Sequence, residues 1–158
     1  MKIFSQADKT VLSLLSAFLI AGSCGLAEAL SESNQISLAA LLYITRAELN
    51  DGKETNRLNH CFYEAPREVV SLLESSLTNK NIQIVTNLHQ FDSEMGSKTI
   101  SRQSFKKFKC KVISTNGTVA RIAVEISRGA DSRRVYEVSM EKRKSAWIVT
   151  TSRLIRIT

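Results

Sequence analysis

The feature that most constrains the fold is a change in the spacing of apolar residues near residue 80. Before this point, apolar side chains recur at helical spacing, which is typical of helices with one buried face. After it, apolar and polar residues alternate, which is typical of strands with one buried face. The chain therefore predicts helices followed by a sheet, the order of an α+β domain.

A first helix is predicted to begin with Ser37 as its N-cap and to stop at Asn50-Asp51-Gly52. Ile36 and Leu41 occupy the two positions of a hydrophobic staple, which fixes the entry of the chain into a helix. Residues 30–36 would then be a short linker. The residues that share the apolar face at helical spacing are Leu38, Leu41, Leu42, Thr45 and Leu49.

The segment Lys53–Ala65 is ambiguous, and a short helix with Leu58, Cys61 and Phe62 on its inner edge is one interpretation. The next helix is clearer, because Pro66 suits a first helical turn and the chain has no other proline. This helix is expected to end near Asn79. Its apolar stripe consists of Val69, Val70, Leu72, Leu73 and Leu77.

From Asn81 onward the period of two predicts strands separated by short turns. Asn116-Gly117 is a strong signal for a hairpin, because tight hairpin turns favour residues that tolerate positive φ. The predicted fold is α+β: helices within 37–79 pack on a curved antiparallel sheet within 81–157, of four or five strands in meander order. The single domain would span 37–158, with the second face of the sheet turned to water or a partner. The predicted strand segments are Asn81–Phe91, Lys106–Ser114, Thr118–Ser127, Arg134–Lys142 and Trp147–Thr158.

An apolar leader precedes this domain. Two lysines are followed by the uncharged run Val11–Gly22, which is too short to span a bilayer and matches the core of a signal peptide. Ala27 and Ala29 provide the small-x-small pattern that a signal peptidase accepts. We therefore interpret residues 1–29 as a signal peptide and Leu30 as the mature start.

Two other interpretations of the leader stay open. The run Ile20–Cys24 is similar to a bacterial lipobox, with Ala21 where leucine is usual, and Cys24 would then be lipidated. Alternatively, the leader is a retained membrane anchor. We expect an exported protein, periplasmic or secreted, that meets the membrane only if it is a lipoprotein of the outer membrane.

Removal of the leader leaves two cysteines, Cys61 and Cys110. An even number of cysteines in an exported chain predicts a disulfide. Closing a loop of this length would stabilise the fold by about 4 kcal/mol in the chain-entropy model. The alternative is two buried free thiols, since cysteine packs as a small apolar residue.

The formal charge of +7 is unevenly distributed. Residues 30–95 carry five Lys or Arg against nine Asp or Glu, whereas residues 96–158 carry fifteen against four. Such a basic half attracts anionic partners, or it serves only solubility. Aromatic residues do not share the basic face of the strand near residue 108, so nucleic acid is a disfavoured partner. The candidate anion-binding residues are Lys106, Lys107, Lys109, Lys111, Arg121, Arg133 and Arg134.

No catalytic constellation is apparent in the sequence. His60 and His89 are the only histidines, so a site with three histidine ligands is impossible. His60 precedes Cys61, but neighbouring residues point in different directions on a helix or a strand. Asp92 and Glu94 suit either a cation site or a solvated turn. Gly-rich phosphate loops and the common hydrolase motifs are absent, so we expect no enzymatic activity, no metal and no cofactor.

The segment Arg133–Ile157 resembles the last two strands of the nuclear transport factor-like (cystatin-like) α+β superfamily. In that family an alternating strand with an aromatic residue is followed by a charged turn and a final strand that opens with Trp-x-Val. The matching positions are Tyr136, Val138, Met140, Trp147 and Val149. The resemblance implies a cone of helices closed by a curved sheet, in a family that includes enzymes, transport factors and noncatalytic periplasmic domains of secretion and conjugation machines.

These observations predict a noncatalytic exported domain, bacterial and periplasmic, that binds a partner protein or an apolar ligand through its sheet. A second hypothesis is a binder of an anionic polymer or surface, such as nucleic acid, lipopolysaccharide or anionic lipid, that uses the basic residues named above. A third is an enzyme with a pocket inside the cone. The partner and the oligomeric state are not specified by the sequence.

Overall fold

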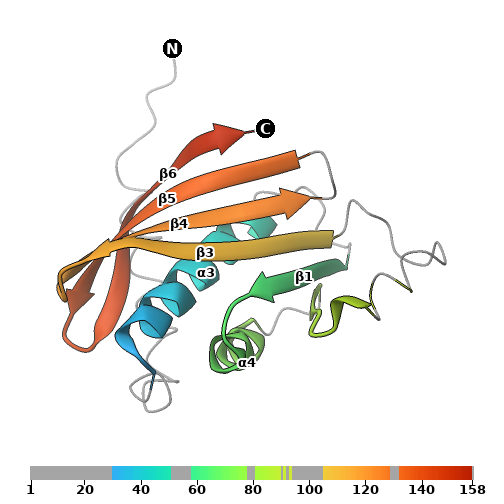
Figure 1. Cartoon of the computed structure of the whole chain (residues 1–158), viewed down its shortest axis with the longest axis horizontal. Helices are drawn as coiled ribbons and strands as arrows, with labels where there is room; N and C mark the ends of the chain where they lie inside the picture. The colour runs from blue at the N-terminus through green and yellow to red at the C-terminus, as the bar shows by residue number, and fades with distance from the viewer. Residues whose placement is uncertain are drawn as a thin grey trace.

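The computed structural model describes residues 30–50, 58–77, 81–89, 91, 93, 105–128 and 132–157. Helices come first and the long strands follow (Figure 1). In chain order the elements are α3 (Glu32–Asn50), β1 (Asn59–Glu64), α4 (Arg67–Ser76), β2 (Ile82–Ile84), β3 (Phe105–Thr115), β4 (Val119–Arg128), β5 (Ser132–Arg143) and β6 (Ala146–Ile157). The predicted α+β fold class is confirmed.

The sheet has the order β2-β1-β3-β4-β5-β6. Strands β3 to β6 form an antiparallel meander, as predicted, because consecutive strands are separated by no more than three residues. β1 and β2 extend this meander at one edge, and β1 is parallel to both β2 and β3. The prediction of a purely antiparallel meander of four or five strands was therefore wrong. Parallel neighbours need crossover connections, and α4 provides the one between β1 and β2.

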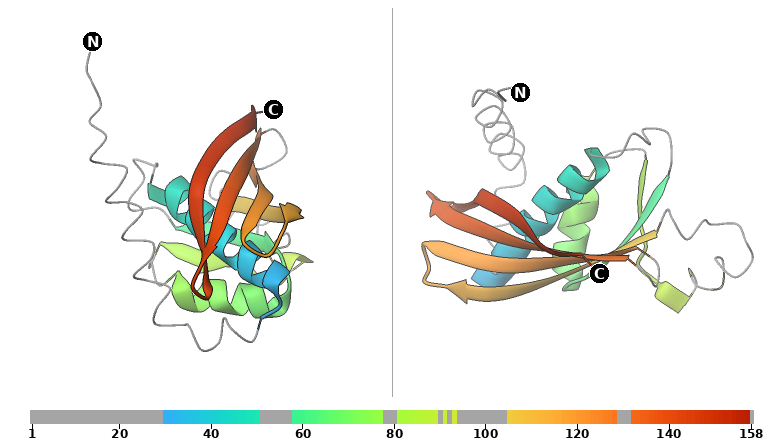
Figure 2. Two further views of the ribbon diagram at one scale, coloured as in Figure 1. Left: turned by 90° about the vertical axis from the view of Figure 1, so that its left-hand side faces the viewer. Right: turned by 90° about the horizontal axis from the view of Figure 1, so that it is seen from above.

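Both described helices lie on the same side of the sheet (Figure 2). α3 crosses the strands and contacts β3, β4 and β6, while α4 packs against α3. This arrangement makes α3 the centre of the core. Its fully buried apolar residues Ile36, Leu41 and Ile44 share one cluster with residues of the strands and of α4. Among the helices that the structure describes, none is long and apolar enough to cross a membrane.

The start of α3 differs from the prediction. The helix begins at Glu32, so the predicted linker 30–36 is mostly helical and Ser37 is not its N-cap. Ser31 occupies that position: its hydroxyl accepts a hydrogen bond from the Asn34 backbone N–H at 3.3 Å. Ser37 is buried in the second turn instead. The prediction of Ser37 as the N-cap was wrong because this second serine also lies close to an apolar run.

The ambiguous segment before Pro66 is a strand rather than a short helix. β1 places Cys61 and Tyr63 in the core, whereas Phe62 and Glu64 lie on the other face. The Tyr63 ring stacks on Phe108 of β3 at 5.0 Å between centroids. The predicted strand at 81–91 is shortened to Ile82–Ile84 of β2, because only these residues pair with β1.

The helix-to-sheet contact contains a buried carboxylate, Glu48 of α3. Its side chain is 4% exposed, and it accepts hydrogen bonds from the Tyr136 hydroxyl at 2.5 Å and the Arg128 guanidinium at 2.6 Å. Arg134 adds a further ion pair at 3.2 Å. Burial alone would raise the pKa of Glu48, but hydrogen bonds from Tyr136 and Arg128 and the two positive charges bring that pKa below its ordinary value.

The backbone of the two tight hairpins generates a first prediction. Gly117 has φ +84° and Lys144 has φ +58°, a region that costs a residue with a Cβ about 1 kcal/mol. No atom lies within 4 Å of a Cβ added at Gly117, so Gly117→Ala should cost about 1 kcal/mol through backbone strain alone. Lys144→Gly should stabilise the protein by about 0.5 kcal/mol. Urea denaturation measures both changes in stability. A stabilising Gly117→Ala or a destabilising Lys144→Gly would contradict the turn geometry.

A second prediction concerns Glu48. Glu48→Gln should lower the free energy of unfolding at pH 7 by roughly 3 kcal/mol, because two partly buried arginines lose their counter-charge. The exposed Glu74 of α4 offers a matched control, and Glu74→Gln should change stability by less than about 0.5 kcal/mol.

The Glu48 effect should also depend on pH. Since the folded pKa lies below the unfolded value, the stabilisation is fully present above about pH 4.3 and is lost as the pH falls through the folded pKa. The stability difference between the natural chain and Glu48→Gln should therefore narrow in acid. A constant difference from pH 7 down to pH 2 would show that the charge of Glu48 is not what stabilises the contact.

Candidate interaction surface

The sheet has two unlike faces, which we name by what lies on them. The helix face packs on α3, and the open face is the opposite one. On β3 the alternation places Phe108 on the helix face, fully buried, and Lys107 and Lys109 on the open face. The alternation of apolar and polar residues that the sequence predicted for this strand is confirmed for residues 107–112.

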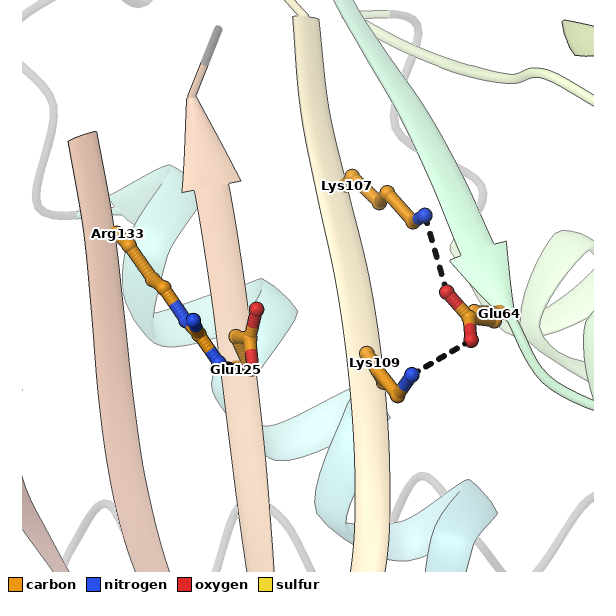
Figure 3. Close-up of polar contacts among 5 residues, drawn as sticks. All are labelled: Glu64, Lys107, Lys109, Glu125 and Arg133. Atoms are coloured by element: carbon orange, nitrogen blue, oxygen red, sulfur yellow. Dashed lines mark hydrogen bonds and ion pairs between the residues drawn. The ribbon is translucent and has the colours of Figure 1, made fainter. Parts of the chain in front are cut away.

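Charges of alternating sign cross the open face from β1 to β5 (Figure 3). Glu64 of β1 lies between Lys107 and Lys109 of β3, with N–O distances of 3.0 and 2.8 Å. Farther along the same row, Glu125 of β4 forms an ion pair with Arg133 of β5. The register places Lys109 directly opposite Glu125, so the row continues without interruption across four strands.

A second group of charges continues toward β6. Glu137 of β5 accepts from Arg121 of β4 at 2.8 Å and from Arg153 of β6 at 3.3 Å. Three acids of the open face, Glu64, Glu125 and Glu137, thus pair with five cations. The open face is consequently a surface of mixed charge rather than a uniformly basic one.

The electrostatics of Glu64 follow from this arrangement. Hydrogen bonds from Lys109 and then Lys107 lower the pKa of the Glu64 carboxyl below its ordinary value. Both lysines and Glu64 are well exposed, and ion pairs of this kind each contribute about 0–1 kcal/mol to stability. The pairs therefore set the charge pattern of the open face more than they hold the fold together.

Two of the seven candidate anion-binding residues do not lie on this face. Lys106 is buried on the helix face, where its register partner is Cys61, and Arg134 lies on the helix face beside Glu48. Both were assigned to a common surface because the sequence clusters them with other cations, although strand alternation turns neighbours to opposite faces. The structure brings the other five together on the open face: Lys107, Lys109, Lys111, Arg121 and Arg133.

Three of the six large apolar residues that are exposed among the described residues lie on β6, which forms one edge of the sheet. Every residue from Thr150 to Ile157 is exposed. Leu154, Ile155 and Ile157 are exposed by 41%, 48% and 65%. Together with Arg153 and Arg156 we call these residues the β6 patch. Sequence reasoning predicted the strand but missed the patch, because periodicity does not show which end of a strand extends beyond its helix.

The predicted disulfide is not formed, and Cys61 and Cys110 are free thiols. Cys61 pairs with Lys106 in the parallel register of β1 and β3, so Cys110 lies four residues farther along the neighbouring strand. At about 3.3 Å per residue this separates the two Cα atoms by roughly 13 Å. A disulfide requires less than about 7 Å, so the prediction was wrong because the strand register decides the distance.

The neighbours His60 and Cys61 point to opposite faces of β1. His60 packs against Phe91 at 5.4 Å between ring centroids, and Phe91 stacks on Phe105 at 4.6 Å. Cys61 lies in the core with no exposed surface, and burial raises its pKa to about 11, although the charge of Lys106 opposes this. At neutral pH Cys61 is therefore a protonated thiol, away from the imidazole.

Within the described ranges, no group of three or more His, Cys, Asp or Glu residues is arranged to hold a metal ion. His89 is exposed and lies in a helical segment after β2. The remaining predicted site residues lie outside the described residues: Cys24, Ala27, Ala29, Asp92 and Glu94.

The comparisons with known proteins return no relative. No family model matches the chain, and neither the curated proteins nor the solved structures contain a match. The structure itself therefore defines the class: an α+β protein whose mixed sheet has helices on one face and a charged open face on the other.

The cysteines generate a third prediction. In the Cys24→Ser variant, denatured without reductant, thiol titration should give two reactive thiols, Cys61 and Cys110. In the folded protein Cys61 should react only on unfolding, because it is fully buried and protonated, whereas the partly exposed Cys110 should react earlier. No free thiol in the denatured chain would show that the disulfide forms after all.

Proposed function

We propose that this protein is a noncatalytic binding domain that recognises a partner protein through its sheet. The observation that carries the proposal is the β6 patch, in which three large apolar residues stand exposed within four positions of an edge strand. Scattered exposed apolar residues need no explanation, but a contiguous group on a sheet edge is typical of a protein-binding site.

The mixed charge of the open face supports a protein partner over a polyanion. Polyanion affinity grows with the number of cations that can each neutralise a phosphate. Here Glu64, Glu125 and Glu137 lie among the cations and reduce the positive potential. A polyanion binder remains the second candidate, favoured by Lys111, an open-face cation with no acidic partner among the described residues.

The state of Cys61 supports a noncatalytic role. A nucleophilic cysteine needs its thiolate and access to substrate. Cys61 has neither, since burial raises its pKa to about 11 and no part of it is exposed. The position of His60 on the opposite face of β1 also removes the nearest candidate base in the sequence.

The location and the family relationship are part of the same proposal. The apolar run Val11–Gly22 and the Ala27/Ala29 pattern support export, to the periplasm of a bacterium, with lipidation at Cys24 as the alternative. A likeness to the nuclear transport factor-like superfamily is supported by the five pattern residues, of which Val138, Met140 and Trp147 are buried. The noncatalytic members of that family are the branch that the proposal follows.

A fourth prediction tests partner binding directly. A photo-cross-linkable amino acid in place of Leu154 should give one discrete protein adduct in the cells that make the chain, because this position lies in the β6 patch. The same amino acid in place of Glu74, exposed on α4, is the matched control and should give none. Equal adducts from both positions, or none from Leu154, would contradict the proposed function.

A further inference from the structure

We propose that the outer edge of β6 accepts an extended segment of the partner protein as an added strand, with acidic side chains beside Arg153 and Arg156. This inference rests on the proposed function and names the manner of binding and the chemistry of the partner. The described residues place no strand outside β6, so its outer backbone N–H and C=O groups face away from the sheet. Such an edge is a template for strand addition.

The two edges of the sheet differ in their capacity to take a strand. β2, at one edge, has three residues, whereas β6, at the other, has twelve. β6 also contains no proline, a residue that would remove an amide donor and so protect an edge from pairing. Register shifts at Ser139/Met140 and Val135/Tyr136 leave Thr151–Leu154 as a regular ladder between them. This part of β6 offers the best-ordered pairing surface.

The charge of the edge selects the partner. From Thr150 to Ile157, β6 carries Arg153 and Arg156 and no acidic residue. Arg153 already has one described counter-charge, Glu137, while Arg156 has no acidic partner within the described ranges. Carboxylates on alternate residues of an added strand would lie opposite these arginines, because cross-strand neighbours on one face are about 5 Å apart.

The opposite face of the added strand would be apolar. Leu154 lies opposite Tyr136, on the helix face, and Ile157 lies opposite Arg134 on the same face. Both are substantially exposed, so an apolar side chain of the incoming strand would bury them. The segment that fits is therefore one in which acidic and apolar residues alternate.

A second copy of this chain fits less well as the occupant. Antiparallel pairing of two β6 strands about a twofold axis near Leu154 and Ile155 would bring Arg153 of one copy close to Arg156 of the other. Like charges at opposed positions destabilise a strand pair. The charge pattern thus favours a different, acidic chain.

The test uses the full chain and a fluorescent synthetic peptide in which glutamate alternates with valine. Fluorescence anisotropy should show binding, and Arg156→Glu should weaken it about tenfold or more, because it places like charges together. Lys111→Glu is the matched control, since it makes the same charge change on the open face of β3, and it should weaken binding less than about twofold. Equal effects of the two substitutions would overturn the proposal in favour of general charge attraction.

Backbone pairing is tested on the peptide itself, which avoids any effect on folding. A peptide N-methylated at alternate residues loses the amide donors of one edge, and it should lose measurable binding, while hydrogen exchange at residues 151–157 should slow only with the unmodified peptide. Unchanged binding of the methylated peptide would show that no strand is added. If the free chain is a dimer in which the amides of residues 151–157 already exchange slowly, the occupant is a second copy of the chain. That result would overturn the proposal.

These outcomes are separable from those of the cross-linking experiment. If Leu154 cross-links to a partner but the peptide does not bind, strand addition is wrong and the proposed function stands. If the peptide binds as expected but no partner cross-links at Leu154, the edge accepts strands and the proposed function is wrong.

Discussion

The contact on which the rest of the structure depends is the buried carboxylate of Glu48. A charge of this kind can be buried only if donors surround it, and Arg128, Arg134 and Tyr136 of the sheet supply them. The donors come from β4 and β5, so satisfying Glu48 fixes where α3 crosses the sheet. Strand alternation places Arg128 and Arg134 on the helix face, so these two arginines pair with Glu48 and do not add to the charge of the open face.

With α3 fixed, the two faces of the sheet acquire separate roles. The helix face holds the core, and the open face holds cations and acids that pair across four strands (Figure 3). Ion pairs this exposed add little stability, but they give nearly every charge of the open face a partner of opposite sign. The β6 patch is different. Its apolar side chains are exposed, and no described strand pairs with its outer backbone edge. Because of this contrast, we propose that a partner binds at the edge rather than at the middle of the sheet.

Much of the fold could be predicted from local patterns. The helical face of Leu38, Leu41 and Leu42, the alternation on β3 and the turn at Gly117 all follow from residue spacing and backbone preference. The site was predicted less well. Glu48 shares a helical face with Leu41 and Thr45, which was a signal that its carboxylate would be buried. Its hydrogen-bond partners lie 80 or more residues away in the sequence, so residue spacing could not identify them. Cation clusters in the sequence likewise did not reveal that Lys106 and Arg134 face the helices.

The sequence by itself determined the two helices, the four long strands that follow them, the buried side of each long strand and the excess of positive charge in the second half, because these depend on neighbours along the chain. Only the tertiary structure decided that β1 and β2 join the sheet in parallel, that Cys61 and Cys110 are too far apart to bond, and that β6 is an edge with an exposed apolar end. The physical reason is that strand register and strand order arise from contacts between distant segments, which residue spacing alone does not specify.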